Sequence, residues 1–255
     1  MLNSLILEKI YNKTFINTKI LILLLKCVIT MKPIIVYEPG PRMEKIIQNL
    51  KGFESLNINP LSSDKSKRIR ELRRLPIEIP IIYLWSSGFN HGESFFFDAN
   101  GIDLKINFDA HDDAETRSSK LGHLYLSHMY HSSKKHNCEV VIFCNQQFHR
   151  LTDNGIKLLN GEKFNFIKKI SYTVDLDIIH NFPAEESWTW DSEMDLNQLL
   201  EILEIAKKRF GGRLMRLDIG GLKLMSRSEL TNEELNFAIE CYNAVLTKGY
   251  NFMIK

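Results

Sequence analysis

Residues 104–113 read LKINFDAHDD, a mainly apolar run that leads directly into Asp109, His111 and Asp113. The first five residues have the length and composition of a β-strand. Side chains two residues apart point the same way while the chain is extended, so Asp109 and His111 are expected on one side. Asp113 can return to the same centre from the following loop. The stretch therefore predicts a strand that ends in a polar site.

Short apolar runs alternate with amphipathic segments on both sides of this stretch. Strands are expected at residues 34–37, 81–85, 139–144, 170–178 and 214–219, and helices at 42–50, 64–75, 121–130, 196–210 and 231–246. Such alternation predicts a mostly parallel sheet with helices on both faces, which is a three-layer α/β sandwich. Thr231 and Glu234 have the spacing of a capping box at the start of the last helix.

The composition excludes several classes of protein. Apolar residues make up 44% of the 255 residues, enough for a sizeable core. The formal charge of +2 argues neither for nor against a nucleic-acid partner, and we expect none. The four cysteines show no metal-binding or disulfide spacing and are typical of a reducing compartment, so we expect a cytoplasmic protein. A small-molecule or peptide substrate is expected, with no membrane partner, and a homo-oligomer is left open.

Residues 1–30 form the only stretch that suggests a membrane or export segment. Its apolar run at residues 20–25 is far shorter than the roughly 20 residues that span a bilayer, and no small-residue cleavage site follows. Met31 directly precedes the first expected strand. We therefore expect an N-terminal appendage or an over-extended start at 1–30 and one domain at 31–255. The basic residues in 64–75 are interpreted as a solvated helix face.

Two further motifs follow expected strands. Asp175 and Asp177 end the strand at 170–178, and His91 lies between glycines just after the strand at 81–85. In parallel sheets, sites collect where the strands end. The aspartates could instead lie in water on an edge strand, and His91 could be an ordinary loop histidine. However, the flanking residues are apolar, and buried carboxylates need a compensating cation. A divalent metal site is the favoured interpretation.

The order Gly-x-x-His, Asp-Ala-His-x-Asp and Thr-x-Asp-x-Asp resembles that of the ureohydrolases, the arginase and agmatinase superfamily. The similar organisation runs from about residue 81 to 221, with close identity confined to the motifs. The resemblance implies two Mn²⁺ ions per chain, one held by His91, Asp109, Asp113 and Asp175, the other by His111, Asp109, Asp175 and Asp177. It also implies a hydrolase of non-peptide C–N bonds that uses a hydroxide shared by both metals.

The same resemblance suggests two proton-handling residues. Asp113 would orient the hydroxide and pass its proton to the leaving nitrogen. His123 lies near the position of a proton-shuttling histidine in relatives, although a plain helix-start histidine is an equal alternative. His128 and His131 are expected at the surface.

Three departures concern the substrate pocket. Residues 178–183 lack the family's Asp-Pro, and the stretch between Asp113 and Asp175 is short. Gly221 stands where arginases and agmatinases place a glutamate for guanidinium recognition, and Glu185 or Glu186 is a candidate substitute. A more open pocket suggests an arginine side chain within a peptide, converted to ornithine and urea, as one substrate.

Other functions remain open. A deacetylase of the same fold usually lacks the third aspartate of the first cluster, so Asp113 argues against it. A metallophosphoesterase would have its Asp-x-His motif before the Asn-His motif, whereas Asn90 and His91 precede Asp109. A non-catalytic relative, whose metal centre supports only the fold or a partner surface, is compatible with the altered substrate positions.

Overall fold

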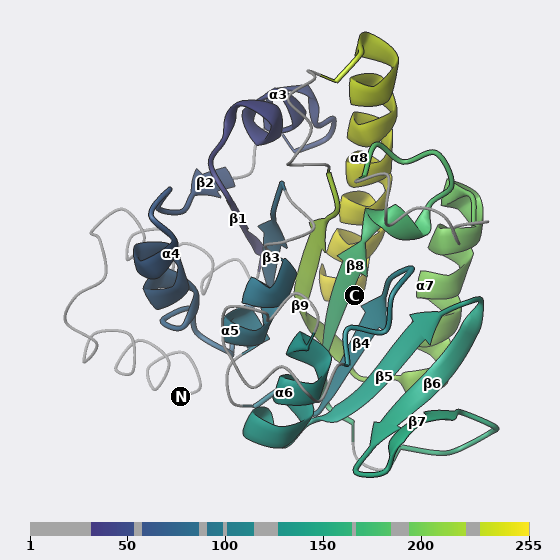
Figure 1. Ribbon diagram of the computed structural model, residues 1–255. Helices are drawn as coiled ribbons and strands as arrows, with labels where there is room; N and C mark the ends of the chain where they lie inside the picture. The colour runs from purple at the N-terminus through teal and green to yellow at the C-terminus, as the bar shows by residue number, and fades with distance from the viewer. Residues whose placement is uncertain are drawn as a thin grey trace.

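The computed structural model describes residues 32–53, 58–86, 91–98, 101–114, 127–164, 167–184, 194–222 and 230–254 (Figure 1). The described strands form one nine-stranded sheet in the order β2-β1-β3-β9-β8-β4-β5-β6-β7. They are β1 Ile34–Tyr37, β2 Ile58–Pro60, β3 Ile81–Leu84, β4 Leu104–Phe108, β5 Glu139–Cys144, β6 Gln147–Thr152, β7 Gly155–Leu158, β8 Lys169–Asp175 and β9 Arg213–Gly220. All neighbours pair in parallel except β5 with β6 and β6 with β7.

Helices cover both faces of this sheet, which confirms the predicted three-layer α/β sandwich. The described helices are α3 Pro41–Asn49, α4 Lys65–Leu72, α5 Ser94–Asp98, α6 His128–His136, α7 Leu196–Phe210 and α8 Asn232–Ile254, with short 3-10 turns η1 His91–Glu93 and η3 Leu176–Ile178. In Figure 1, α5 and α6 lie in front of the sheet and α8 runs behind it. Separate apolar clusters join α4 and α5 to one face and α3, α7 and α8 to the other.

The central strands β4 and β8 are buried on both faces of the sheet, but their side chains are apolar on one face and polar on the other. Leu104, Ile106 and Phe108 of β4 pack in the large core with α3, α7 and α8, whereas Lys105 and Asn107 are fully buried on the opposite face. The same alternation in β8 places the buried Ser171 and Thr173 on the polar face. Asp109 and Asp175 continue this polar alternation at the ends of their strands.

The hairpin of β6 and β7 was not predicted. β6 is joined to β5 by Asn145 and Gln146, whose φ angles of 48° and 61° form a two-residue turn of the hairpin type. Asparagine adopts positive φ more readily than most residues, so Asn145 was the available sequence signal. The hairpin makes the sheet antiparallel at one edge and leaves the central parallel strands unchanged.

Several local predictions can now be compared with the structure. The capping box is confirmed, because Glu234 N donates to Thr231 Oγ1 and Thr231 N donates to Glu234 Oε2. The basic face expected at 64–75 is wrong at Arg68, which is buried within α4. Most of the helix expected at 121–130 lies outside the described residues, as do residues 1–30. Across the described segments, no helix has both the length and the apolar character that a bilayer crossing requires.

Candidate metal centre

Asp109 and Asp175 lie at the same edge of the sheet, because β4 and β8 are parallel neighbours. Phe108 is in register with Val174, so the residue that follows each of them leaves the sheet at the same level. Both carboxylates are almost completely buried. The sheet therefore brings together two aspartates that are 66 positions apart in the sequence.

Asp177 reaches the same edge by a turn, which corrects the expected strand at 170–178. The strand β8 ends at Asp175, and the chain continues as the 3-10 turn η3. The Asp175 carboxylate accepts a hydrogen bond from Asp177 N at 3.2 Å. A short acidic side chain that bonds the backbone two residues on favours a turn over continued strand pairing. Asp177 is consequently buried beside Asp175.

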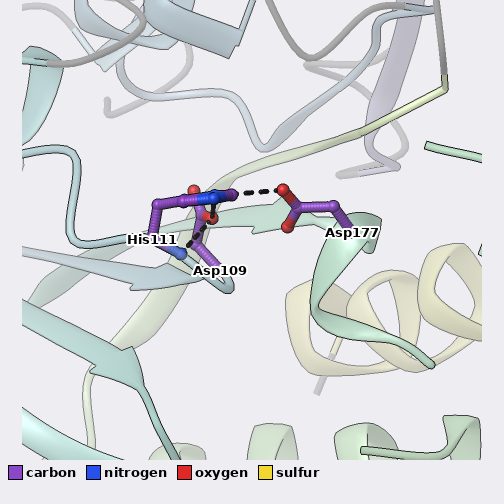
Figure 2. Close-up of side chains that lie close together, drawn as sticks. All are labelled: Asp109, His111 and Asp177. Carbon is purple, nitrogen blue, oxygen red and sulfur yellow. Dashed lines mark hydrogen bonds and ion pairs between the residues drawn. The ribbon is translucent and has the colours of Figure 1, made fainter. Parts of the chain in front are cut away.

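The side chains of Asp109, His111 and Asp177 converge, as Figure 2 shows. His111 Nδ1 lies 3.2 Å from Asp109 Oδ1 and 3.1 Å from Asp177 Oδ2. The His111 backbone N–H donates to Asp109 Oδ1 at 2.7 Å, and Asn107 Nδ2 donates to Asp109 Oδ2 at 3.2 Å. One ligand atom from each of the three residues falls within 4.8 Å of the others. This is the spacing at which three side chains can share one cation.

The pKa values of two residues in this cluster are raised, each for a different main reason. Hydrogen bonds to Asp109 and then Asp177 raise the pKa of His111 to about 11, against the effect of burial. Burial raises the pKa of Asp177 well above its usual value, and the charges of Asp175 and Asp109 add to this, while His111 lowers it. The two shifts share one contribution, because the negative charges of the neighbouring aspartates favour a bound proton at either residue. In the metal-free protein, protonated His111 supplies part of the compensating positive charge.

Asp113 is held by His128, a contact that the sequence analysis missed. His128 Nε2 lies 3.0 Å from Asp113 Oδ2, and both side chains are buried. Asp113 has a φ of 46°, a left-handed conformation that aspartate tolerates better than most residues. His128 and His131 were expected at the surface, and both are buried. The available signal was the buried face of α6, on which His128, His131 and Ser132 recur at helical spacing.

Four of the sequence-predicted positions can be placed only in part or not at all. His91 begins η1 after β3, but its side chain is outside the described residues. His123, Glu185 and Glu186 also fall outside them. The described residues thus bring together Asp109, His111, Asp175 and Asp177, and they place Asp113 against His128.

Gly221 packs directly against the aspartates. Its φ is +120°, and a Cβ built there would lie 2.4 Å from Asp175 Oδ1 and 2.8 Å from Leu176 N. The preceding Gly220 is equally restricted, because the Trp85 ring occupies the place of a Cβ. Position 221 therefore has no room for any side chain, including a glutamate.

The donor set suits a hard divalent cation. Asp109, Asp113, Asp175 and Asp177 are all at least 96% buried, and buried carboxylates are costly unless donors or a cation compensate them. Carboxylate oxygens with imidazole nitrogen favour ions such as Mn²⁺ over soft metals. Burial, together with the charges of Asp175 and Asp109, raises the pKa of Asp177, which reflects the cost of keeping its carboxylate charged at this site. The residues present therefore fit a metal centre of this kind.

The fold and this edge of the sheet define a class of protein: a three-layer α/β protein with an aspartate-rich centre where the parallel strands end. No protein-family model and no curated protein matches the sequence. Solved structures do match, and they belong to the arginase and ureohydrolase superfamily. The chain therefore has the fold of that superfamily, as the motifs suggested.

Three of these structures illustrate the match. Proclavaminate amidino hydrolase from Streptomyces clavuligerus aligns with 87% of this chain and 92% of its own, at 12% identity and a TM-score of 0.60. A putative agmatinase from Clostridium difficile aligns over 88% and 98%, at 14% identity and a TM-score of 0.55. Formimidoylglutamase from Bacillus subtilis aligns over 88% and 87%, at 12% identity and a TM-score of 0.55. Identities this low show a shared fold alone.

Proposed function

We propose that the protein is a binuclear manganese-dependent hydrolase of non-peptide C–N bonds, acting on a guanidino or amidino group. The observation that carries the proposal is the burial of Asp109, Asp175 and Asp177 where β4 and β8 of a ureohydrolase fold end. His111 contacts two of these aspartates, Asp109 and Asp177. Proteins with this fold include an amidino hydrolase and a putative agmatinase. We therefore propose the same class of reaction for this protein.

Two groups of residues would hold the metals. His91, Asp109, Asp113 and Asp175 would hold one ion, and His111, Asp109, Asp175 and Asp177 the other, so that Asp109 and Asp175 are shared. When bound, the metals would supply a water activated for attack near neutral pH. In support, Asp109, His111 and Asp177 already converge within ligand distance.

Side chains of the protein would transfer the proton that the nucleophilic water loses. Asp113 would accept it from the nucleophilic water and pass it to the leaving nitrogen. His128 Nε2, at 3.0 Å from Asp113 Oδ2, would hold that carboxylate in place and favour its charged form. His128 thus takes a supporting role that we had not expected from the sequence. His123 stays a candidate for proton transfer.

The substrate's positive group must be recognised differently from that of arginine in arginases. Position 221 cannot carry a carboxylate, because its Cβ would collide with Asp175. A guanidinium needs a charged acceptor to replace its lost hydration. Recognition would therefore come from another residue or from a substrate held by more than its guanidinium. A peptide offers such additional contacts, so we propose arginine side chains in peptides as the specific substrate.

The test is turnover of a substrate panel with purified protein loaded with Mn²⁺. Arginine-containing peptides should release urea, whereas free arginine and agmatine should not, and the same peptides with citrulline in place of arginine serve as blanks. Asp109→Ala should abolish release because it removes a shared ligand. Asp112→Asn is the matched control. Asp112 is the exposed acid of the same motif, and among the described residues its carboxylate accepts a hydrogen bond from a neighbouring backbone group, Ala114 N.

Other outcomes would redirect the assignment. Faster turnover of free arginine or agmatine than of peptides would reject the peptide substrate and keep the class of reaction. One metal per chain with release of acetate from acetylated amines would favour a deacetylase. Bound metal without turnover on a broad panel would favour a non-catalytic relative, which the missing acceptor at Gly221 makes a specific alternative.

A further inference from the structure

Arg68 and Glu93 form a buried ion pair outside the candidate metal centre. Arg68 lies on α4, and Glu93 is the last residue of η1. Arg68 Nε and Nη2 donate to Glu93 Oε2 and Oε1 at 2.8 and 2.7 Å, the two-pronged geometry that guanidinium and carboxylate favour. Tyr83 of β3 donates to Glu93 Oε2 at 3.1 Å. Glu93 is therefore fixed from two elements.

The same guanidinium reaches a second carboxylate. Arg68 Nη2 lies 3.4 Å from Oε1 of Glu38, a buried residue that follows β1. Glu38 Oε2 in turn accepts hydrogen bonds from Ser86 N and Ser86 Oγ at 3.1 and 3.0 Å. Arg68 Nη1 also donates to the carbonyls of Ser62 and Ser63 before α4. Arg68 thus joins α4 to the ends of β1 and β3.

Ser86 and Glu93 stand on either side of His91 in the sequence. Ser86 follows β3, and Glu93 closes the same 3-10 turn that His91 opens. Ser86 is held by the carboxylate of Glu38, and the carboxylate of Glu93 is held by Arg68. The Arg68 guanidinium contacts both of these carboxylates. Replacing a buried ion pair with apolar residues often costs little stability. We therefore consider a role for these ion pairs in positioning other residues. Here the ion pairs fix the backbone on both sides of a proposed ligand.

We propose that Arg68, through Glu93 and Glu38, is the positioning residue for His91 and so sets the affinity of one of the two metals. The inference rests on the proposed function, which assigns His91 to one ion and His111 to the other. Mutating a residue that fixes the orientation of a metal ligand typically weakens metal affinity by about 10- to 100-fold. The metal held by His91 should depend on Arg68, and the metal held by His111 should not.

The experiment measures Mn²⁺ binding by calorimetry and metal content in the full-length protein. The double variant Arg68→Met/Glu93→Gln removes the ion pair without leaving Glu93 charged and buried. We expect wild type to bind two ions, and the double variant to bind one as tightly as wild type and the other about 10- to 100-fold more weakly. Arg68→Lys, which keeps the charge and loses the two-pronged geometry, should give a smaller loss at the same metal.

A stability control separates positioning from general damage. Leu203→Ala opens a cavity in the core beneath α7 and should lower the Tm while leaving both affinities unchanged. Should the double variant fail to fold, Tyr83→Phe and Ser86→Ala each remove one hydroxyl of the network and should weaken the same metal selectively.

The outcomes distinguish the two proposals. Two ions bound with wild-type affinity in the folded variants would overturn the role of Arg68 and leave the proposed function standing. Equal weakening of both ions would also overturn it, because His91 is assigned to only one. A wild-type protein that binds no Mn²⁺ would overturn the proposed function and this inference together.

Discussion

The contact of Asp113 with His128 shows how a single buried residue can support a proposed metal ligand. His128 is fully buried at the start of α6, and its Nε2 meets Asp113 Oδ2. A histidine in this position can donate a hydrogen bond to the carboxylate and favour its charged form. Asp113 also holds a left-handed backbone conformation, which costs free energy unless the surroundings fix it. His128 supplies part of that fixation.

Replacing His128 should therefore weaken metal binding, although His128 is not itself one of the proposed ligands. His128→Asn should weaken Mn²⁺ binding about 10- to 100-fold, because Asp113 loses a buried partner. It should also lower the free energy of unfolding by about 1–3 kcal/mol. Calorimetric titration with Mn²⁺ and chemical denaturation measure the two effects.

His131→Asn is the control for this prediction. His131 is buried one turn further along the same helix, where its backbone N–H bonds Ser127 O. A similar loss of stability with unchanged Mn²⁺ affinity is expected. Equal Mn²⁺ affinity in the His128 and His131 variants would contradict the supporting role of His128.

Among the elements, the junction of β8 and β9 determines what the candidate site can contain. The two strands pair in parallel, with Asp175 in register with Gly220, so Gly221 lies where Asp175 turns into η3. Gly221 adopts a φ of +120°, which L-residues rarely adopt. The close approach of these two backbones keeps Asp175 in position and excludes a side chain from β9 at this point.

A glutamate introduced at position 221 should thus fail to supply an acceptor for a guanidinium. Gly221→Glu is expected to displace the Asp175 carboxylate and to reduce bound Mn²⁺, because its Cβ cannot fit at 2.4 Å from Asp175 Oδ1. Gly221→Ala should show the same loss of metal, since the clash arises at the Cβ. Metal content by atomic spectroscopy checks both variants.

Gly155→Ala provides a comparison for backbone conformation alone. Gly155 has a similar φ of +109° in the β6–β7 hairpin, but no atom lies within 4 Å of its Cβ position. This variant should be mildly destabilised and keep its metal. Full metal content in Gly221→Ala would show that Asp175 is not constrained as described.

For the whole molecule, metal binding should be linked to both folding and pH. In the metal-free protein, Asp109 and Asp177 raise the pKa of His111 to about 11, above its usual value of 6.5. The stabilisation from protonated His111 is fully present below pH 6.5 and is lost as the pH rises through about 11. A metal competes with that proton for the imidazole, so its binding must release the proton.

The gain in stability from Mn²⁺ should consequently increase with pH. An ion at about 1,000 times its Kd stabilises the fold by about 4 kcal/mol, and each proton released makes binding up to about tenfold tighter per pH unit. Thermal unfolding with Mn²⁺ and with a chelator, at pH 6.5 and pH 8.5, should show the larger difference in Tm at pH 8.5. Asp109→Ala should show almost no difference at either pH. A larger difference at pH 6.5 would contradict the linkage.

The sequence by itself determined the layers of the fold and the position of most candidate ligands. Strands β1, β4 and β5 and helix α7 begin and end at the predicted residues, because their apolar patterns and boundaries are local. Asp109 and Asp175 were placed correctly at strand ends for the same reason. The motif spacing also indicated the superfamily whose fold the chain has.

Only the tertiary structure decided which residues of different elements meet, both in the candidate metal centre and beside it. The pairing of β4 with β8 brings Asp109 to Asp175, α6 brings His128 to Asp113, and α4 brings Arg68 to Glu93. The exclusion of a side chain at Gly221 likewise depends on β8 lying beside β9. These contacts join residues that are 15 to 66 positions apart in the sequence. They depend on packing between elements, so the local periodicity of the sequence does not reveal which residues pair.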